Sequence, residues 1–275
     1  MLRYIKINCI LSKIDKSPLE FMGSTLRGAF GVSLKKVSCI NPNYECLGCF
    51  AQKNCLYYNF FEVKNKFHSY RFSKALADEN FDFILYLFED SCEKLPFILS
   101  ALKEMLTIQG LGVERKLFQI ESITCNGVQV LNGHSFDLGT VIPKEFEIND
   151  YSNCATLFFK TPLRIKSENK LLRSKPSLEQ ILASIFNRIS EIKGLPFEKL
   201  PFTPEYQELQ SNISFHDLTR YSNRQQTKMQ IGGILGHICY ENLDTKSYQL
   251  LKLGEILGVG KQTVFGLGEI KIENN

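Results

Sequence analysis

The chain has 275 residues, 44% of them hydrophobic and 23% charged, and it carries a formal net charge of +4 at pH 7. This composition is typical of a globular protein with enough apolar side chains for one large domain or two ordinary ones. No apolar run approaches the roughly 18 residues that a membrane-spanning helix needs, and the N-terminus lacks the apolar core of a signal peptide. We therefore expect a cytoplasmic protein with reduced thiols and no membrane partner.

The N-terminal half begins with two elements of clear apolar periodicity. A strand is expected over Leu2–Leu11 and a long amphipathic helix over Phe21–Val37. A second amphipathic helix starts at Leu95 and is followed by Gly110-Leu111-Gly112 and an alternating strand that ends at Ile123. The order is therefore strand and helix at the start of this half, and helix and strand at its end.

Four cysteines between these helices have the spacing C-x6-C-x2-C-x5-C. They are Cys39, Cys46, Cys49 and Cys55. Disulfides are rare in the cytosol, whereas four thiolates complete the closed tetrahedral shell of structural zinc. An iron–sulfur cluster also uses four thiolates and is the alternative metal centre, and a group of small buried cysteines is the alternative without metal. The spacing favours structural zinc, with no open position for a catalytic metal.

The C-terminal half repeats the order of elements. Its expected strands and helices are Ala155–Ile165, Leu178–Ile192, the strand pair Ile213–Tyr221 and Gln230–Tyr240, Tyr248–Leu257, and Phe265–Ile272. Each half thus has the order β-α-β-β-α-β of a ferredoxin-like unit. The predicted fold class is α+β, with tandem ferredoxin-like (RRM-like) domains, antiparallel sheets and a small Cys-rich insertion at 39–55 in the first.

The domain boundary is expected in Pro143–Asn153, where Pro, Asn, Asp and Ser accumulate. This gives an N-terminal domain over 1–148 and a C-terminal domain over 149–275. Helices on one face of each sheet leave the other face open, and in RRM-type modules that face binds RNA. Two such modules in series are expected to form a cleft.

Basic residues cluster in two stretches of the C-terminal half. Six lie between Lys160 and Lys175, and Arg220, Arg224 and Lys228 lie among neutral polar side chains and Tyr221. Cations mixed with hydrogen-bonding side chains and an aromatic suit a sugar–phosphate backbone. A solvated charged surface is the alternative interpretation.

The last segment, "GEILGVGKQTVFGLGEIKI" (Gly254 to Ile272), is rich in glycine but does not fit a nucleotide-binding loop. A P-loop needs Gly-Lys-Ser/Thr between a strand and a helix, whereas Gly260-Lys261 is followed by Gln262 and the loop leads from a helix to a strand. A glycine C-cap at Gly258 explains one or two of the five glycines. We expect no bound nucleotide.

Several motifs resemble one known family. "DLTRYSNRQQTKMQIGGILGHICY" followed by the glycine-rich segment is similar to the C-terminal region of the CRISPR pre-crRNA-processing endoribonucleases, a branch of the RAMP superfamily with tandem ferredoxin-like domains. "LRGAFGVSLKKVSCI", the four cysteines leading to "CLYYNFFE", and "GLGVERKLF" are similar to the first domain of that family. The resemblance covers nearly the whole chain.

The resemblance implies that the chain binds CRISPR repeat RNA or crRNA, with other CRISPR effector subunits as further partners. It also implies that the terminal loop holds the RNA backbone, since glycines let main-chain N–H groups approach phosphate and Lys261 adds charge. The RNA-binding residues assigned on this basis are Arg27, Arg115, Arg220, Tyr221, Arg224, Gly258, Gly260, Lys261, Thr263, Gly266 and Gly268.

The family cleaves RNA without a catalytic metal, by attack of a ribose 2′-OH that leaves a 2′,3′-cyclic phosphate and a 5′-hydroxyl. This chemistry needs a base, an acid and cations near the phosphate. Many members have a histidine in or near the first helix, where this chain has none, and often another where this chain has Gly258. His216 is the candidate base, and Lys35 and Lys36, with Arg27, are candidates to stabilise the phosphate, unless the first helix only exposes them to solvent.

The other histidines are weaker candidates. We expect His237 to be packed or at a strand edge, and His68 and His134 to be exposed to solvent. Two functions therefore stay open: a metal-independent endoribonuclease that matures guide RNA, and a non-catalytic RNA-binding subunit of the same system.

Overall fold

The computed structural model describes residues 1–14, 17–64, 66–148, 150–167, 169–222 and 227–274. They form two compact units, Met1–Glu145 and Phe146–Asn275. The sequence-based division placed residues 146–148 in the first unit instead. No helix in the described ranges is both long and apolar enough to cross a membrane.

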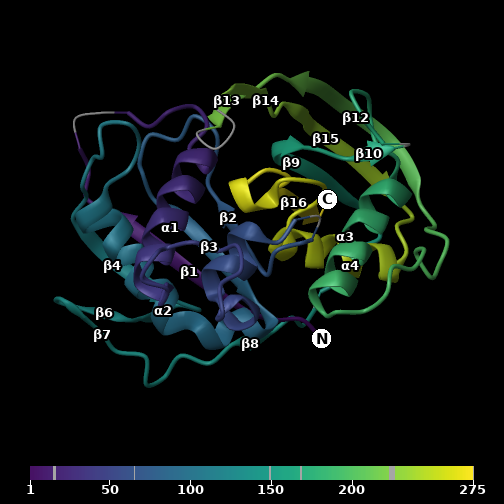
Figure 1. Cartoon of the computed structure of the whole chain (residues 1–275). Coiled ribbons are helices and arrows are strands. Elements are labelled where there is room, and N and C mark those ends of the chain that lie inside the picture. Colours follow the sequence, from purple (N-terminus) through teal and green to yellow (C-terminus); the bar gives the residue numbers. More distant parts are fainter. Residues whose placement is uncertain (15–16, 65, 149, 168, 223–226, 275) are drawn as a thin grey trace. The chain divides into compact units, whose positions relative to one another are not determined.

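The first unit is a ferredoxin-like α/β sandwich (Figure 1). Its six main elements are β1 (Arg3–Leu11), α1 (Gly23–Ser38), β2 (Tyr70–Ser73), β3 (Phe83–Phe88), α2 (Leu95–Glu104) and β4 (Ile120–Cys125). The strand order is β2-β3-β1-β4-β5, with β5 at Val128–Gln129, and β8 (Lys144–Glu145) pairs with the start of β1. All of these strand pairs are antiparallel. A small hairpin, β6 (Leu131–Asn132) and β7 (Ser135–Phe136), lies between β5 and β8 in the chain.

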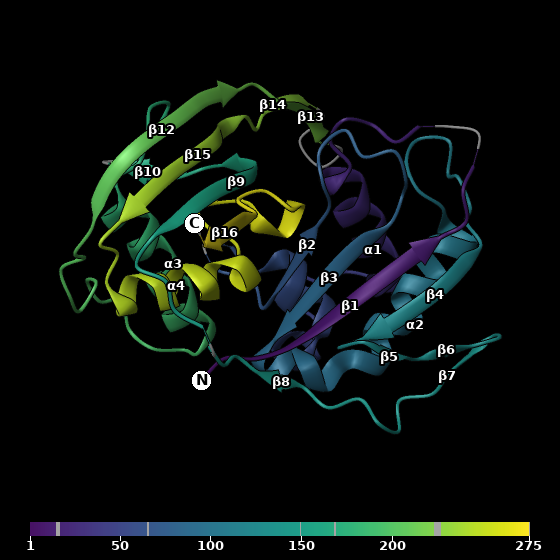
Figure 2. The ribbon, with the colours of Figure 1, turned by 180° about the vertical axis from the view of Figure 1, so that it is seen from behind.

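The core of the first unit lies between its sheet and α1 and α2, which cover one face (Figure 2). Every second residue of β1 from Ile5 to Leu11 is buried, as expected for a strand with one face on a core. On α1, Phe30 is fully buried, and its ring centroid lies 6.0 Å from that of Tyr70 and 5.6 Å from that of Phe72. These aromatic contacts fix α1 over β2.

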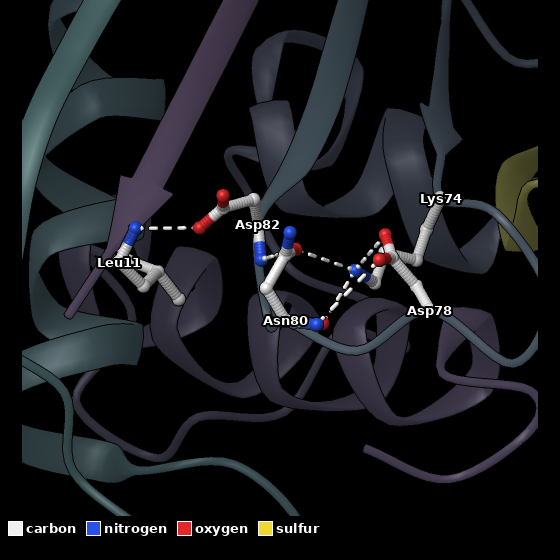
Figure 3. Close-up of polar contacts among 5 residues, drawn as sticks. All are labelled: Leu11, Lys74, Asp78, Asn80 and Asp82. Carbon is white, nitrogen blue, oxygen red and sulfur yellow. Dashed lines mark hydrogen bonds and ion pairs between the residues drawn. The ribbon is translucent and has the colours of Figure 1, made fainter. Parts of the chain in front are cut away.

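A buried lysine closes the turn between β2 and β3 (Figure 3). Lys74 Nζ donates to Asp78 Oδ2 and to the main-chain oxygen of Asn80, both at 2.6 Å. Asp82 follows in the same turn, and its Oδ1 accepts the N–H of Leu11 at 2.7 Å. Burial acts to raise the pKa of Asp78, but the hydrogen bond and charge of Lys74 outweigh it and leave the pKa below its ordinary value. The turn is therefore held by a paired buried charge.

The second unit has the same topology. Its elements are β9 (Ala155–Leu163), α3 (Leu178–Ile192), β12 (Gln207–His216), β15 (Gly233–Glu241), α4 (Thr245–Leu257) and β16 (Ile270–Asn274). The strand order β12-β15-β9-β16 matches β2-β3-β1-β4 of the first unit. Two short hairpins are added: β10 (Lys166–Ser167) with β11 (Lys170–Leu171), and β13 (Thr219–Ser222) with β14 (Thr227–Gln230). The predicted α+β class and tandem ferredoxin-like fold are confirmed.

Several predicted elements differ in extent, and two of these differences concern the candidate RNA-binding segments. The last strand starts at Ile270 and not at Phe265, because Gly266 and Gly268 have φ of 79° and 70°, which extended backbone does not allow. Residues 263–265 form a 3₁₀ turn instead. The predicted long strand Ile213–Tyr221 is split after His216 into β12 and β13.

Candidate functional site

A groove runs along the exposed side of α1 in the first unit. We call it the α1 groove. Its volume is about 510 Å³ and it is lined by Arg27, Gly28, Gly31, Val32, Lys35, Lys36, Tyr44, Tyr57 and Phe61. It brings together the two lysines predicted as catalytic and one arginine predicted to bind RNA.

Helical spacing explains why these cations share one side of α1. Arg27, Gly31 and Lys35 follow one another at intervals of four residues and therefore lie in one row. Gly31 allows the ring of Phe61 to pack against the helix, since a Cβ at residue 31 would lie 2.7 Å from Phe61 Cε1. A Cβ at Gly28 would have no neighbour within 4 Å, so the groove is open at that position.

Each of the two cations of this row lies over an aromatic ring of the facing segment. The Arg27 guanidinium lies 4.7 Å from the Phe61 ring centroid, and Lys35 Nζ lies 5.0 Å from that of Tyr57. The two rings are stacked at 8° with centroids 5.4 Å apart. Burial raises the pKa of Tyr70 behind them, and the neighbouring Arg27 charge offsets part of the rise. Positive charge held against aromatic faces suits a nucleotide, which presents both a phosphate and a base.

Lys36 lies on the adjacent row of α1 and is more exposed than Lys35. Its ammonium pairs with Glu104 Oε1 of α2. The carboxylate of Glu104 thus partly compensates the positive charge of Lys36. Arg27 and Lys35 are the cations that contact the aromatic rings of the groove.

The four cysteines lie in the irregular segment that forms the other wall of this groove. All four are free and partly buried. Burial is the main cause of the raised pKa of Cys46, and Lys35 opposes the rise. Cys39 ends α1, and its Sγ lies 3.7 Å from the oxygen of Asn41.

Within the described residues, no group of three or more His, Cys, Asp or Glu side chains is arranged to hold a metal ion. Cys39 and Cys55 nevertheless lie near enough to Cys46 to raise its pKa, and the metal site of four cysteines stays a prediction. The segment also contributes Tyr44, Tyr57 and Phe61 to the α1 groove. Sequence reasoning missed these aromatics, although the i, i+4 spacing of Tyr57 and Phe61 was a usable signal.

The glycine-rich loop of the second unit is closed on itself. Gly258 ends α4 with φ of 73°, as the sequence predicted for a C-cap. Seven amides of the loop donate within the chain: Gly258 to Gly254 O, Val259 to Gly268 O, Gly260 to Ser184 Oγ, Lys261 to Arg164 O, Phe265 to Gln262 O, Gly266 to Thr263 O and Gly268 to Pro162 O, at 2.7–3.1 Å. These amides already have acceptors within the chain in this conformation, and binding of RNA by the loop stays a prediction.

Close packing explains the glycines better. A Cβ at Gly268 would lie 1.8 Å from Val259 O, and one at Gly260 would lie 2.4 Å from Arg164 O. Arg188 of α3 is 2% exposed and donates to the oxygen of Gly260. Of the loop residues predicted to bind RNA, Lys261 is exposed, and Gly258, Gly260, Thr263, Gly266 and Gly268 are all buried.

The β13–β14 hairpin is attached to this loop through an arginine. The Arg220 guanidinium lies 4.6 Å from the Phe265 ring centroid, and its Nη2 lies 3.3 Å from Met229 Sδ. Tyr221 pairs with Lys228 across the hairpin. Arg224 lies outside the described residues. The structure therefore brings Arg220 and the glycine loop together within the second unit, whereas Arg115 sits exposed in a turn of the first.

The histidines occupy different environments. His216 ends β12 opposite Gly233 and is half-buried, and the neighbouring Asp217 pairs with Arg173 at 3.7 Å. His68 is half-buried with its ring centroid 5.9 Å from that of Tyr70, so the expectation that it is exposed is wrong. His134 is exposed, as expected. His216 belongs to the second unit, and Lys35 and Lys36 belong to the first.

Comparison with known proteins gives two partial family matches. The model for the CRISPR-associated endoribonuclease Cas6 matches residues 157–270, and a model described as an N-terminal domain matches residues 15–136. An uncharacterized protein of Archaeoglobus fulgidus is 26% identical over 281 residues, which covers 92% of each chain.

Solved structures share the fold over the full length. A Cas6 of Thermus thermophilus matches with a TM-score of 0.57 at 14% identity and covers 99% of this chain and 98% of its own. A Cas6-related protein of Pyrococcus furiosus matches with a TM-score of 0.52 at 13% identity and covers 99% of both chains. The chain is therefore similar to the CRISPR-associated endoribonuclease Cas6 family over residues 157–270, and its whole length shares the tandem ferredoxin-like fold of solved Cas6 proteins.

Proposed function

We propose that the chain is an endoribonuclease that cleaves CRISPR repeat RNA in precursor crRNA without a catalytic metal. The observation that carries this proposal is the α1 groove, where Arg27 and Lys35 are held on aromatic rings in a chain of Cas6 type. Structures similar to this chain include a Cas6 solved as a product complex and a RAMP protein described as binding different RNA substrates. The description of the RAMP protein supports RNA as the ligand.

The proposed reaction is an internal transfer of the phosphate. A base removes the proton of a ribose 2′-OH, the O2′ attacks the adjacent phosphorus, and the bond from phosphorus to the 5′ oxygen breaks. The leaving oxygen takes a proton from an acid, which gives a 2′,3′-cyclic phosphate and a 5′-hydroxyl. Arg27 and Lys35 would stabilise the negative charge that builds on the phosphate oxygens, with Lys36 beside them. His216 is the proposed base.

The test is incubation with the cognate repeat RNA in the presence of a chelator, followed by analysis of product ends. We expect cleavage that leaves a cyclic phosphate, and a slower reaction with Lys35→Ala. The matched control is Lys13→Ala, which changes an exposed lysine of the same unit away from the groove. Cleavage that depends on added divalent metal, or equal rates for the two variants, would contradict the mechanism.

A second function, a non-catalytic RNA-binding subunit, is favoured by one observation. Helix α1 (Gly23–Ser38) contains no histidine, so the groove itself holds no imidazole to act as base or acid. The same incubation separates the two functions, because a binding subunit would retain the repeat RNA intact in a stable complex.

A further inference from the structure

The sheet of the second unit has one face turned away from its helices. A Cβ on Gly254 of α4 would contact the side chains of Ile185 of α3 and Ile270 of β16, so these elements pack on the same face. On β9, Leu157 and Phe159 are buried on that face. Phe158 and Lys160 alternate with them and therefore lie on the opposite, open face. Phe158 is half-buried and Lys160 is exposed.

The strand register sets a row of side chains across this open face. Asn212 of β12 pairs with His237 of β15, His237 pairs with Phe158 of β9, and Phe158 pairs with Lys271 of β16. Directly paired residues point to the same face of a sheet. We call Asn212, His237 and Phe158 the Phe158 row. The ring centroids of His237 and Phe158 are 5.6 Å apart with a 40° tilt, so two partly accessible rings lie next to each other.

Polar and charged groups flank these rings. Asn212 is exposed and offers an amide donor and acceptor, and Lys160 Nζ lies 6.0 Å from the Phe158 ring centroid. The Lys271 ammonium pairs with Glu255 of α4 at 3.2 Å, so its charge is directed to the edge of the sheet. An acid, Glu273, lies further along β16, on the row that contains Thr156. The rings therefore have a cation on one side and an amide on the other.

The two rings stand on the two central strands of the sheet order β12-β15-β9-β16. Sheets of this topology bind single-stranded RNA when aromatic side chains of the open face stack on unpaired bases. A cation beside the rings can follow the phosphate, and an amide can hydrogen-bond to a base edge.

We propose that the Phe158 row is a stacking platform for one or two unpaired bases of the RNA. Phe158 and His237 supply the ring surfaces, Lys160 contacts the backbone, and Asn212 contacts a base edge. This site is made by residues other than those of the α1 groove and the glycine loop. The proposal rests on RNA being the ligand, as proposed above, but does not depend on cleavage.

The experiment measures binding of the full chain to a fluorescent single-stranded repeat RNA in chelator. Phe158→Leu keeps apolar volume in place of the ring, and His237→Ala removes the second ring. We expect each variant to bind the single strand about tenfold more weakly, and the double variant more weakly still, because base stacking contributes about 1–3 kcal/mol per base. Binding of a fully paired duplex of the same sequence should change little.

The matched control is Phe197→Leu, which alters an aromatic side chain of the same unit that is 80% exposed and lies outside the sheet. Thermal melting of each variant shows whether the fold is intact. Photocrosslinking of RNA that carries 5-bromouridine should label peptides with Phe158 or His237.

The outcomes separate this proposal from the proposed function. If the folded variants Phe158→Leu and His237→Ala bind the single strand with the affinity of the unchanged chain, the platform proposal is wrong, even when cleavage occurs. If binding weakens as expected while no cleavage is seen, the platform stands and the nuclease proposal fails. Crosslinks confined to other peptides would also overturn the platform.

Discussion

The two units share one topology but use their first helices in opposite ways. In the first unit, α1 presents Arg27 and Lys35 on aromatic rings along an open groove. In the second, α3 directs Ser184 and Arg188 into the glycine loop, where they bind the amide and the oxygen of Gly260. The same position in the fold thus displays cations in one unit and fixes a loop in the other.

The loops after the second helices show the same contrast. In the first unit, Leu111 pairs with Lys116 in a turn whose tip, Val113, is fully exposed. In the second, Val259 is fully buried and its amide donates to Gly268. A repeated fold therefore does not imply repeated function, because the side chains around each helix and loop decide what is left accessible.

The largest expected effect tests which unit supplies the general base. His216→Ala should slow cleavage of bound repeat RNA by about 10²- to 10⁴-fold, since this is the usual contribution of a positioned base or acid. His68→Ala, in the first unit, should change the rate only a few fold. Single-turnover cleavage in chelator measures both.

His134→Ala is the control for this pair, because His134 is exposed in the turn of the small β6–β7 hairpin. A large loss of cleavage rate with His68→Ala and none with His216→Ala would show that the base is His68 of the first unit, near Tyr70 and Arg27.

A pair of glycines tests the contrast between closed loop and open groove. Gly268→Ala should lower the free energy of unfolding by roughly 2–4 kcal/mol, because the new Cβ would meet Val259 O and φ is +70°. Gly28→Ala should instead raise it by up to about 1 kcal/mol, because residue 28 is helical and a Cβ there has no close neighbour. Urea denaturation measures both. Equal effects would show that the loop is not closed as described.

A pair of cations tests the contrast between the two first helices. Arg188→Met should destabilise the protein by about 2–3 kcal/mol, since a buried charged hydrogen bond to Gly260 O is lost. Lys35→Met should cost less than about 1 kcal/mol, the usual value of an accessible cation–aromatic contact, and should weaken RNA binding. Denaturation and RNA titration of both variants check this. Strong destabilisation by Lys35→Met would show that Lys35 mainly stabilises the fold.

Much of the fold follows from periodicity in the sequence. The predicted helix Leu178–Ile192 has the same bounds as α3, and the glycine at 258 ends α4 as expected. The last strand was predicted too early, because Phe265 and Leu267 alternate with glycines like strand residues. Only the three-dimensional packing shows that Gly266 and Gly268 turn the chain.

The candidate site was predictable only in part. Arg27, Lys35 and Lys36 could be placed on one helix from sequence, but the opposite wall comes from an irregular segment whose path no periodicity predicts. The cysteine spacing there predicts a metal site, which stays a prediction, and local turns such as the hydrogen bond from Cys49 N to Cys46 O at 3.3 Å shape the segment. The Phe158 row depends on the pairing register of strands that are far apart in the sequence, and this register cannot be predicted from composition.

The smallest predicted effect concerns the N-terminal caps of the helices. In α3 and α4 a side chain of the N-cap residue accepts a main-chain hydrogen bond, whereas α1 and α2 have no such side-chain cap. Asp244 caps α4 by accepting the N–H of Ser247 at 3.0 Å. Burial acts to raise the pKa of Asp244, but the hydrogen bonds from Ser247 and Glu205 together lower it by more. The net pKa is therefore below the ordinary value.

Because the folded pKa of Asp244 is lowered, its stabilising effect is complete above the unfolded pKa of about 3.9 and is lost as the pH falls through the folded value. Asp244→Asn removes the carboxylate charge at the helix N-terminus and one of two accepting oxygens, so it should cost about 1 kcal/mol at pH 7 and progressively less below pH 4. Ser177→Ala removes the side-chain cap of α3. Because a serine hydroxyl does not titrate in this range, the loss of stability, also about 1 kcal/mol, should be constant with pH. Denaturation of the three proteins across this pH range measures the difference, and a constant cost for Asp244→Asn would show that the carboxylate charge contributes nothing to the cap.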